Sequence, residues 1–194
     1  MLIMAKTSDP TRVTTGIVRL SYANLNQPKS INGGDAKYSA SILIPKSDTR
    51  TLELVEAAVK SAYEDGAGKL RGKSKSVPAL KTLKLPLRDG DEERPDDEAY
   101  QDHFFLNASN KEQPDCVDRN RQEIIDPSEL YSGIYARVRL NFYAFNAEGN
   151  RGIAVSLNGV QKVKDGPHLG GRENAAEVFD DGFEFDDDEF DFLG

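Results

Sequence analysis

Residues 134–145 read Ile-Tyr-Ala-Arg-Val-Arg-Leu-Asn-Phe-Tyr-Ala-Phe, and this stretch decides the fold class. Its even positions are all apolar, whereas its odd positions carry aromatic, arginine and amide side chains. This period of two predicts a β-strand with one core face and one outward face. A helix would place Arg137 and Asn141 on the same stripe as Ile134 and Val138, where a core would bury them unpaired.

Other strands and one helix are predicted around this strand. The strand candidates are 11–22, with Gly16 as a bulge, 37–44, 103–108 and 153–163, with Gly159 as a second bulge. A helix is expected to begin at Ser47 or Asp48 and to end at Gly66 and Gly68. Turn formers fill 26–36, a seven-residue connection precedes 153, and 109–130 is a predicted loop with a helical turn at 127–129.

The predicted order is therefore β-β-α-β-β-β with long loops. It favours a mainly β fold, a five-stranded OB-fold barrel with one interposed helix. A two-sheet sandwich shares these cues and stays open at this point.

The charges divide the chain into parts. The net charge is −8, but residues 173–194 hold ten acids and no base, and residues 89–102 hold eight acids beside Arg94. The remainder holds 15 acids and 24 bases. We predict a basic domain over 8–172 and an acidic C-terminal tail over 173–194, which its charge density should leave disordered.

The outward face of 134–145 predicts a site for single-stranded nucleic acid. Aromatic rings stack on unpaired bases, at roughly 1–3 kcal/mol for each base, and arginines meet phosphates. The predicted binding residues on this strand are Tyr135, Arg137, Arg139, Tyr143 and Phe145. Two alternatives remain: the face is a plain solvated strand, or the helix covers Tyr143 and Phe145.

A basic stretch strengthens this interpretation. Residues 69–88 contain no acid and seven bases, whose charge would neutralise several phosphates, although a solvated loop is an alternative. Its bases are Lys69, Arg71, Lys73, Lys75, Lys81, Lys84 and Arg88. We expect the first four, together with Lys37, to contact DNA.

The tail combines acids with regularly spaced aromatic residues, which suits a docking peptide that charge steers and rings anchor. The predicted partner-binding residues are Phe183, Phe185, Asp186, Asp187, Asp188, Phe190 and Phe192. Such a tail can also fold back on the basic surface of its own protein and compete with nucleic acid. An inert charged end is the alternative.

Catalytic and metal-binding patterns are missing from the sequence. Cys116 is the single cysteine, and His103 and His168 do not stand at ligand spacing with it. We therefore expect no cofactor, no metal and no enzymatic activity. No apolar run approaches the ~18 residues of a membrane span, so no membrane association is expected.

The region 107–172 also resembles a known family. The matching segments are Phe105–Ala108, Val117–Asn120, Tyr131–Gly133, Asn141–Asn146, Gly152–Ala154, Leu157–Lys162 and Asp165–Arg172. They are similar to the bacteriophage-encoded single-stranded-DNA-binding proteins with an OB fold. The tail departs from that family, whose tails commonly end in phenylalanine, because it ends Phe192-Leu193-Gly194.

The resemblance implies a protein that coats and protects single-stranded DNA without sequence preference during phage replication, recombination and repair. It places the protein in the cytoplasm of the infected bacterium and implies that the tail recruits phage or host replication proteins. Rival hypotheses are a strand-annealing recombination protein, a DNA-mimicking inhibitor and a nuclease using acids of 89–98. The oligomeric state stays open.

Overall fold

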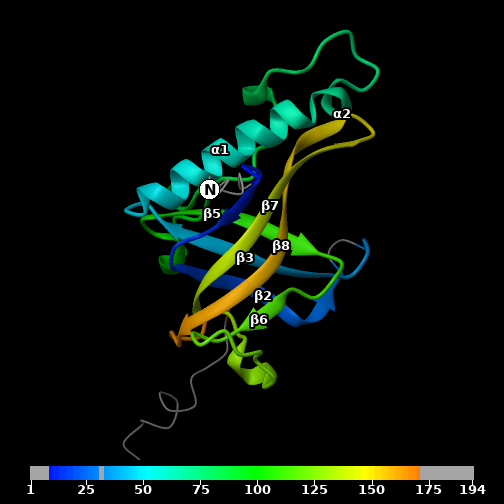
Figure 1. The fold of residues 1–194 in the computed structure, drawn as a ribbon. Coiled ribbons are helices and arrows are strands. Elements are labelled where there is room, and N and C mark those ends of the chain that lie inside the picture. The colour runs from blue at the N-terminus through cyan, green and yellow to red at the C-terminus, as the bar shows by residue number, and fades with distance from the viewer. Residues whose placement is uncertain (1–8, 31–32, 171–194) are drawn as a thin grey trace, which may run out of the picture.

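The computed structural model of the chain describes residues 9–30 and 33–170 (Figure 1). The predicted tail, with all seven of its proposed partner-binding residues, lies outside this range. The strands are β1 (Arg12–Thr14), β2 (Val18–Lys29), β3 (Lys37–Pro45), β4 (Arg88–Asp89), β5 (His103–Asn110), β6 (Asp115–Val117), β7 (Tyr135–Ala147) and β8 (Asn150–Lys164). The helices are α1 (Thr49–Asp65), α2 (Ala67–Arg71) and α3 (Gly90–Glu93), with 3-10 turns η1 (Leu80–Thr82), η2 (Glu98–Tyr100) and η3 (Pro127–Glu129).

Five strands close into a barrel in the order β2-β3-β5-β8-β7 and back to β2. The contact between β5 and β8 is parallel and is recorded at one residue pair, Ser109 with Ser156, whereas the other four junctions are antiparallel. The short strands β1, β6 and β4 add to β7, β8 and β5 respectively. This arrangement confirms the predicted mainly β OB fold with a helix between its second and third barrel strands.

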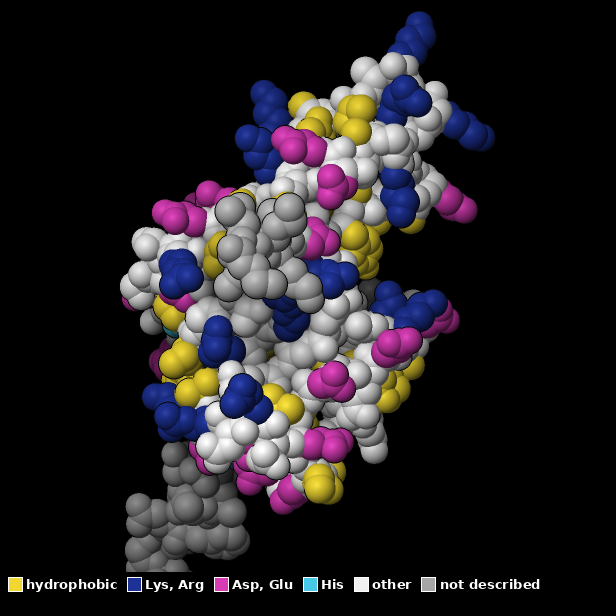
Figure 2. Space-filling model, viewed as in Figure 1, with side chains coloured by type: hydrophobic (Ala, Val, Ile, Leu, Met, Phe, Trp, Pro, Cys, Tyr) yellow, Lys and Arg dark blue, Asp and Glu magenta, His cyan; other side chains and the backbone are white. Residues whose placement is uncertain are grey.

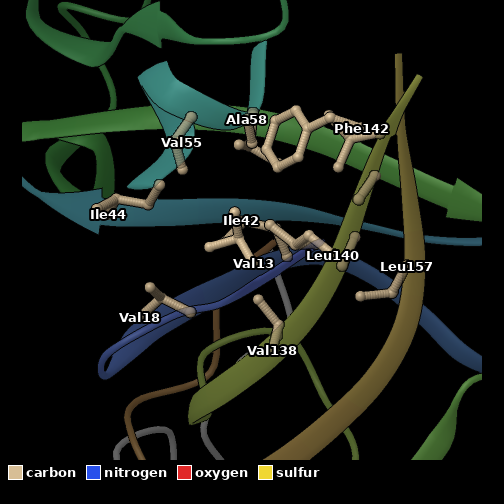
Figure 3. Close-up of a cluster of buried hydrophobic side chains, with 14 of the residues drawn as sticks. Val13, Val18, Ile42, Ile44, Val55, Ala58, Val138, Leu140, Phe142 and Leu157 are labelled. Carbon is tan, nitrogen blue, oxygen red and sulfur yellow. The ribbon is translucent and has the colours of Figure 1, made fainter. Parts of the chain in front are cut away.

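Helix α1 covers one end of this barrel. The side chain of Asp48 accepts a hydrogen bond from the amide of Thr51, as the predicted N-cap should. Val55 and Ala58 then meet Ile44 and Phe142 in the core, which Figure 3 shows between the helix and the strands. The predicted helix is confirmed from its cap to its end at Gly66.

The alternation on β7 is confirmed residue by residue. Its even positions from Ile134 to Ala144 are at most 5% exposed. The register with β8 shifts between Arg139, which pairs with Gly159, and Leu140, which pairs with Leu157, so the predicted bulge lies at Asn158–Gly159. The predicted seven-residue connection is wrong, because the strands continue to a turn at Glu148 and Gly149, both at positive φ, as a type I′ hairpin requires.

Two other boundaries differ from the prediction. Residues 11–22 are not one strand, because the chain leaves β1 at Thr15–Gly16 and enters β2 at Val18. The amide of Gly16 donates to Thr51 Oγ1, and a Cβ at this position would lie 2.6 Å from Asp48 Oδ2, so a side chain there would displace the carboxylate that caps α1. Strand β2 then continues to Lys29, through residues expected to form a turn.

The predicted loop 109–130 contains strand β6 as well as the expected turn at 127–129. Cys116 at its centre is 8% exposed and belongs to the core. Burial, followed by the charge of Asp115, raises the pKa of its thiol to about 11. Among the residues with described positions, no helix has the length and apolar character needed to cross a membrane.

Candidate nucleic-acid interface

The five residues predicted on β7 share its outward face, which extends over roughly 33 Å from residue 135 to 145. Arg137, Arg139 and Tyr143 are exposed, with 42% of Tyr143 accessible. Tyr135 and Phe145 are half-buried. The two arginines and the exposed ring of Tyr143 therefore lie along the strand between two half-buried rings, one at each end.

The end of β1 and the residue after it hold the two arginines in place. Nε of Arg137 donates to the carbonyl oxygen of Thr15 at 3.1 Å, and Nη1 of Arg139 donates to Oγ1 of Thr14 at 2.8 Å. A guanidinium has five N–H donors, so most donors of each side chain remain for a ligand. The arrangement is a pair of oriented cations two residues apart.

Tyr135 lies among cations. The guanidinium carbon of Arg19 is 5.3 Å from the ring centroid, and Nζ of Lys164 is 4.7 Å from it. Arg19 is itself held by the carbonyl oxygens of Gly133 and Pro167, at 3.2 and 2.8 Å. The lower end of the β7 face is thus a positive patch built around a ring, and neither cation was in the predicted set.

The basic segment meets the other end of β7. Lys69 and Arg71 lie on α2, and Lys73 and Lys75 follow it, all four exposed. Two bonds tie this segment to the β7–β8 hairpin: Asn146 Nδ2 donates to the carbonyl oxygen of Lys69 at 3.0 Å, and Arg151 Nη2 donates to Ser74 Oγ at 2.9 Å. Figure 2 shows Lys and Arg side chains gathered at this upper end, which we call the basic tip (residues 69–75).

Tyr143 connects the strand to the basic tip. It lines a hollow with Lys69, Gly66 and Ala62, where the junction of α1 and α2 passes β7. The helix leaves the ring exposed, so the alternative in which α1 covers Tyr143 is wrong. Phe145 packs against β8, since a Cβ at its pair partner Gly152 would lie 2.9 Å from Phe145 Cε1.

The other predicted bases lie elsewhere. Lys37 is opposite Lys29 at the end of the β2–β3 pair, and β3 does not pair with β7. The chain after the basic tip runs back along β8, where the amide of Lys84 donates to Arg151 and its carbonyl accepts from Ile153. Arg88 then reaches β5, with its guanidinium over Phe105 and paired with Glu93.

The acidic segment 89–102 is packed on the barrel instead of being a free loop. Lys46 Nζ lies 2.8 Å from Asp89 and 2.7 Å from Asp91, and the hydrogen bonds from Lys46 hold the pKa of both carboxyl groups below the usual range. No group of three metal-ligating side chains was found in residues 9–30 and 33–170.

Sequence reasoning missed one pair of side chains on the outward face of β2. Tyr22 is 57% exposed, and Arg94 of the acidic segment donates to its hydroxyl at 3.3 Å, which raises the pKa of that guanidinium. Only weak features of the sequence mark these two residues as candidates for the site. Tyr22 ends a predicted strand, and Arg94 is the one base among eight acids. The OB fold uses its second and third barrel strands for oligonucleotides, so this neighbouring face is relevant.

Three comparisons identify relatives of the chain. Residues 11–193 match the family described as Enterobacter phage Enc34, ssDNA-binding protein. A putative protein p50 of Acyrthosiphon pisum secondary endosymbiont phage 1 is 35% identical over 168 residues, covering 84% of this chain and 90% of the relative.

Two solved structures share the fold. The single-stranded DNA-binding protein from bacteriophage Enc34 in complex with ssDNA has a TM-score of 0.71 at 22% identity and covers 82% of this chain and 90% of its own. Gp2.5, a single-stranded DNA binding protein encoded by bacteriophage T7, has a TM-score of 0.60 at 15% identity and covers 90% of this chain and 98% of its own. The match over residues 11–193 shows that the chain belongs to the Enc34 family of phage single-stranded-DNA-binding proteins.

Proposed function

We propose that this protein coats and protects single-stranded DNA, without sequence preference, during phage DNA replication, recombination and repair in the cytoplasm of the infected bacterium. The observation that carries the proposal is the continuous surface formed by the β7 face and the basic tip, which Asn146 and Arg151 hold together. Family membership supports the same class of ligand.

The surface suits a flexible strand of bases and phosphates. Arg137 and Arg139 present oriented N–H donors to phosphates, and the exposed ring of Tyr143 offers a stacking face between them and the basic tip. Phe145 and Tyr135 add half-buried rings at the two ends. The bases of residues 69–75 meet phosphates that continue past the hairpin. No contact in this scheme reads a base edge, so binding is independent of sequence.

Fluorescence anisotropy of the full chain with labelled oligo-dT, and with a duplex of the same length, tests this function across a salt series. Tight binding of the single strand that weakens steeply with salt supports it. Absence of single-strand binding at low salt would refute it. A DNA-mimicking inhibitor would give that negative result while still binding a nucleic-acid enzyme, and a nuclease would cleave the labelled strand when Mg²⁺ is added.

The acidic tail, residues 173–194, is proposed to compete with DNA for this surface and to recruit phage or host replication proteins. Its ten acids have the charge for the first role, and its aromatic residues suit the second. Deletion of 173–194 is expected to tighten oligo-dT binding most at low salt. Weaker binding after truncation contradicts the competition, and annealing of complementary strands by the full chain would favour a recombination role.

A further inference from the structure

The outward face of β2, β3 and β5 carries a floor of small polar side chains. Ala40, Ile42, Leu106 and Ala108 point into the core, so their neighbours on these strands point outward. The floor consists of two rows that follow the strand pairing: Ser21, Ser41 and Asn107, then Asn24, Ser39 and Ser109. Tyr100 covers the end of the floor at Ser41 and leaves Ser21 and Ser41 only 4% and 2% exposed, whereas Asn107 is exposed and the other three side chains are half-buried. Each of the six side chains bears a hydrogen-bonding group.

Tyr22 stands beside this floor in an unusual conformation. Its φ is +45°, a region that side chains with a Cβ rarely adopt, and it occupies the register shift of β2 between Ser21 and Asn24. Asn24 Nδ2 donates to its carbonyl oxygen at 3.1 Å. The irregular backbone lifts the ring outward, because 57% of the side chain is accessible while Ser21 before it is 4% exposed. Such outliers persist where the surroundings impose them, and they cluster at binding sites.

Arg94 lies over the Tyr22 ring and holds it. Its guanidinium carbon is 5.5 Å from the centroid of Tyr22 and 5.3 Å from that of Tyr100. Tyr100 is fully buried, and its hydroxyl is 3.1 Å from Oγ of Ser41 in the polar floor. The chain of contacts runs from the barrel through Tyr100 and Arg94 to Tyr22. The exposed ring is therefore positioned before any ligand arrives.

We propose that Tyr22 is a stacking site for one unpaired base, that Arg94 positions it, and that the neighbouring acids make this site select single-stranded over duplex DNA. The inference rests on the proposed function and locates a second contact region, apart from the β7 face. Arg19 joins the two regions, because it lies on β2 next to the floor and over the ring of Tyr135 on β7.

The acids explain the selectivity. Glu92, Asp96 and Glu98 are exposed and lie within four residues of Arg94, and no salt bridge involves them in the described part of the chain. Like charges near a ligand path repel phosphates over about a Debye length, near 8 Å at physiological salt. A single strand can turn a base toward Tyr22 and its phosphates toward solvent. A duplex presents its phosphates first, so the acids oppose its approach.

The stacking role is tested with the full chain, a labelled oligo-dT and an abasic oligonucleotide of equal length. Tyr22→Ala is expected to weaken oligo-dT binding about 30-fold, the middle of the range for loss of one stacked base, and to leave abasic binding unchanged. Tyr22→Phe keeps the ring and its contact with the Arg94 guanidinium but removes the hydroxyl that Arg94 donates to, so its affinity is expected to lie between those of wild type and Tyr22→Ala. Equal affinity of Tyr22→Ala and wild type for oligo-dT, or an equal loss on the abasic strand, overturns the proposal.

Arg94 is tested by a double-mutant cycle. If it acts through Tyr22, Arg94→Ala weakens oligo-dT binding in the wild-type background and has no further effect beside Tyr22→Ala. Additive losses contradict the positioning role. Thermal unfolding of each variant confirms that it is folded, and Tyr22→Ser supplies a second ring-free variant.

The acids are tested by the triple change Glu92→Gln, Asp96→Asn, Glu98→Gln. Duplex affinity is expected to rise more than single-strand affinity, whereas the matched change Glu53→Gln, Glu56→Gln, Glu64→Gln on the exposed side of α1 raises both alike. If the ratio of duplex affinity to single-strand affinity is the same in the two triple variants, the proposed selectivity is wrong. If the wild-type chain binds no single strand, the proposed function fails; if it binds but Tyr22→Ala matches it, only this inference fails.

Discussion

Replacing Arg137 and Arg139 together by alanine should flatten the salt dependence of single-strand binding. Both arginines are exposed, and Thr15 and Thr14 orient their guanidinium groups through one hydrogen bond each. Each phosphate contact with a single strand contributes about 0.7 to the slope of log K against log salt, so two lost contacts reduce the slope by about 1.4. Between 1 M and 0.1 M salt this difference amounts to about 25-fold in affinity.

The change should leave the barrel folded. The aliphatic side of β7, not its outward face, forms the core, and each arginine gives up one hydrogen bond, a loss of about 0.5–1.5 kcal/mol. Urea denaturation of the double variant checks this point before binding is measured. An unfolded variant would lose binding at every salt concentration instead of losing its slope.

The assay is fluorescence anisotropy of labelled oligo-dT at several salt concentrations from about 0.05 M to about 1 M, a range wide enough to measure the slope of log K against log salt. A matched control is Lys60→Ala with Arg119→Ala, which removes two exposed bases from α1 and from the loop after β6. The control should keep the wild-type slope apart from a small long-range effect. An unchanged slope in the Arg137/Arg139 variant, or an equal decrease in the control, would refute the role of the β7 face.

Three further predictions concern the scaffold. Phe142→Ala, at a core position 2% exposed, is expected to lower the free energy of unfolding by about 3–5 kcal/mol in urea titrations; a loss below about 1 kcal/mol would contradict the packing. Gly149→Ala should cost about 1–2 kcal/mol by the same measurement because φ is +88°, although its Cβ would meet no atom within 4 Å. Lys46→Met should lower the melting temperature at pH 7, and this effect should be lost progressively as the pH falls below the usual carboxyl pKa of about 4. The lowered pKa values of Asp89 and Asp91 make their contribution present above the unfolded pKa and absent once both are protonated, so a pH-independent difference would contradict the pairing.

Local patterns were sufficient for the largest elements. Strand β7 follows from strict alternation over twelve residues, and α1 follows from a cap, a helical stripe and a terminal glycine, all of which lie within a short stretch of chain. The outward direction of Arg137, Arg139 and Tyr143 follows from the same alternation. These predictions succeed because the physical cause is contained in the stretch itself.

The missing parts depend on distant partners. Strand β6 has three residues, and its parallel pairing with β8 joins Cys116 to Val160, so no local pattern indicates it. Tyr22 and Arg94 are 72 residues apart and meet only after the acidic segment packs on the barrel. The cover of Tyr135 by Arg19 and Lys164 likewise arises from strand pairing. Residue types alone therefore predicted the outward direction of the polar side of β7 and gave no indication of the contact between Tyr22 and Arg94.

The burial of Cys116 has a practical consequence for labelling. It is the single cysteine in the sequence, it is 8% exposed, and its thiol has a pKa of about 11. Maleimide dyes react with the thiolate, so this side chain is nearly inert toward them near neutral pH. A cysteine introduced at Glu56, on the exposed side of α1, would accept a fluorophore at one defined position. The natural chain can thus serve directly as the background for single-molecule fluorescence measurements of oligonucleotide binding.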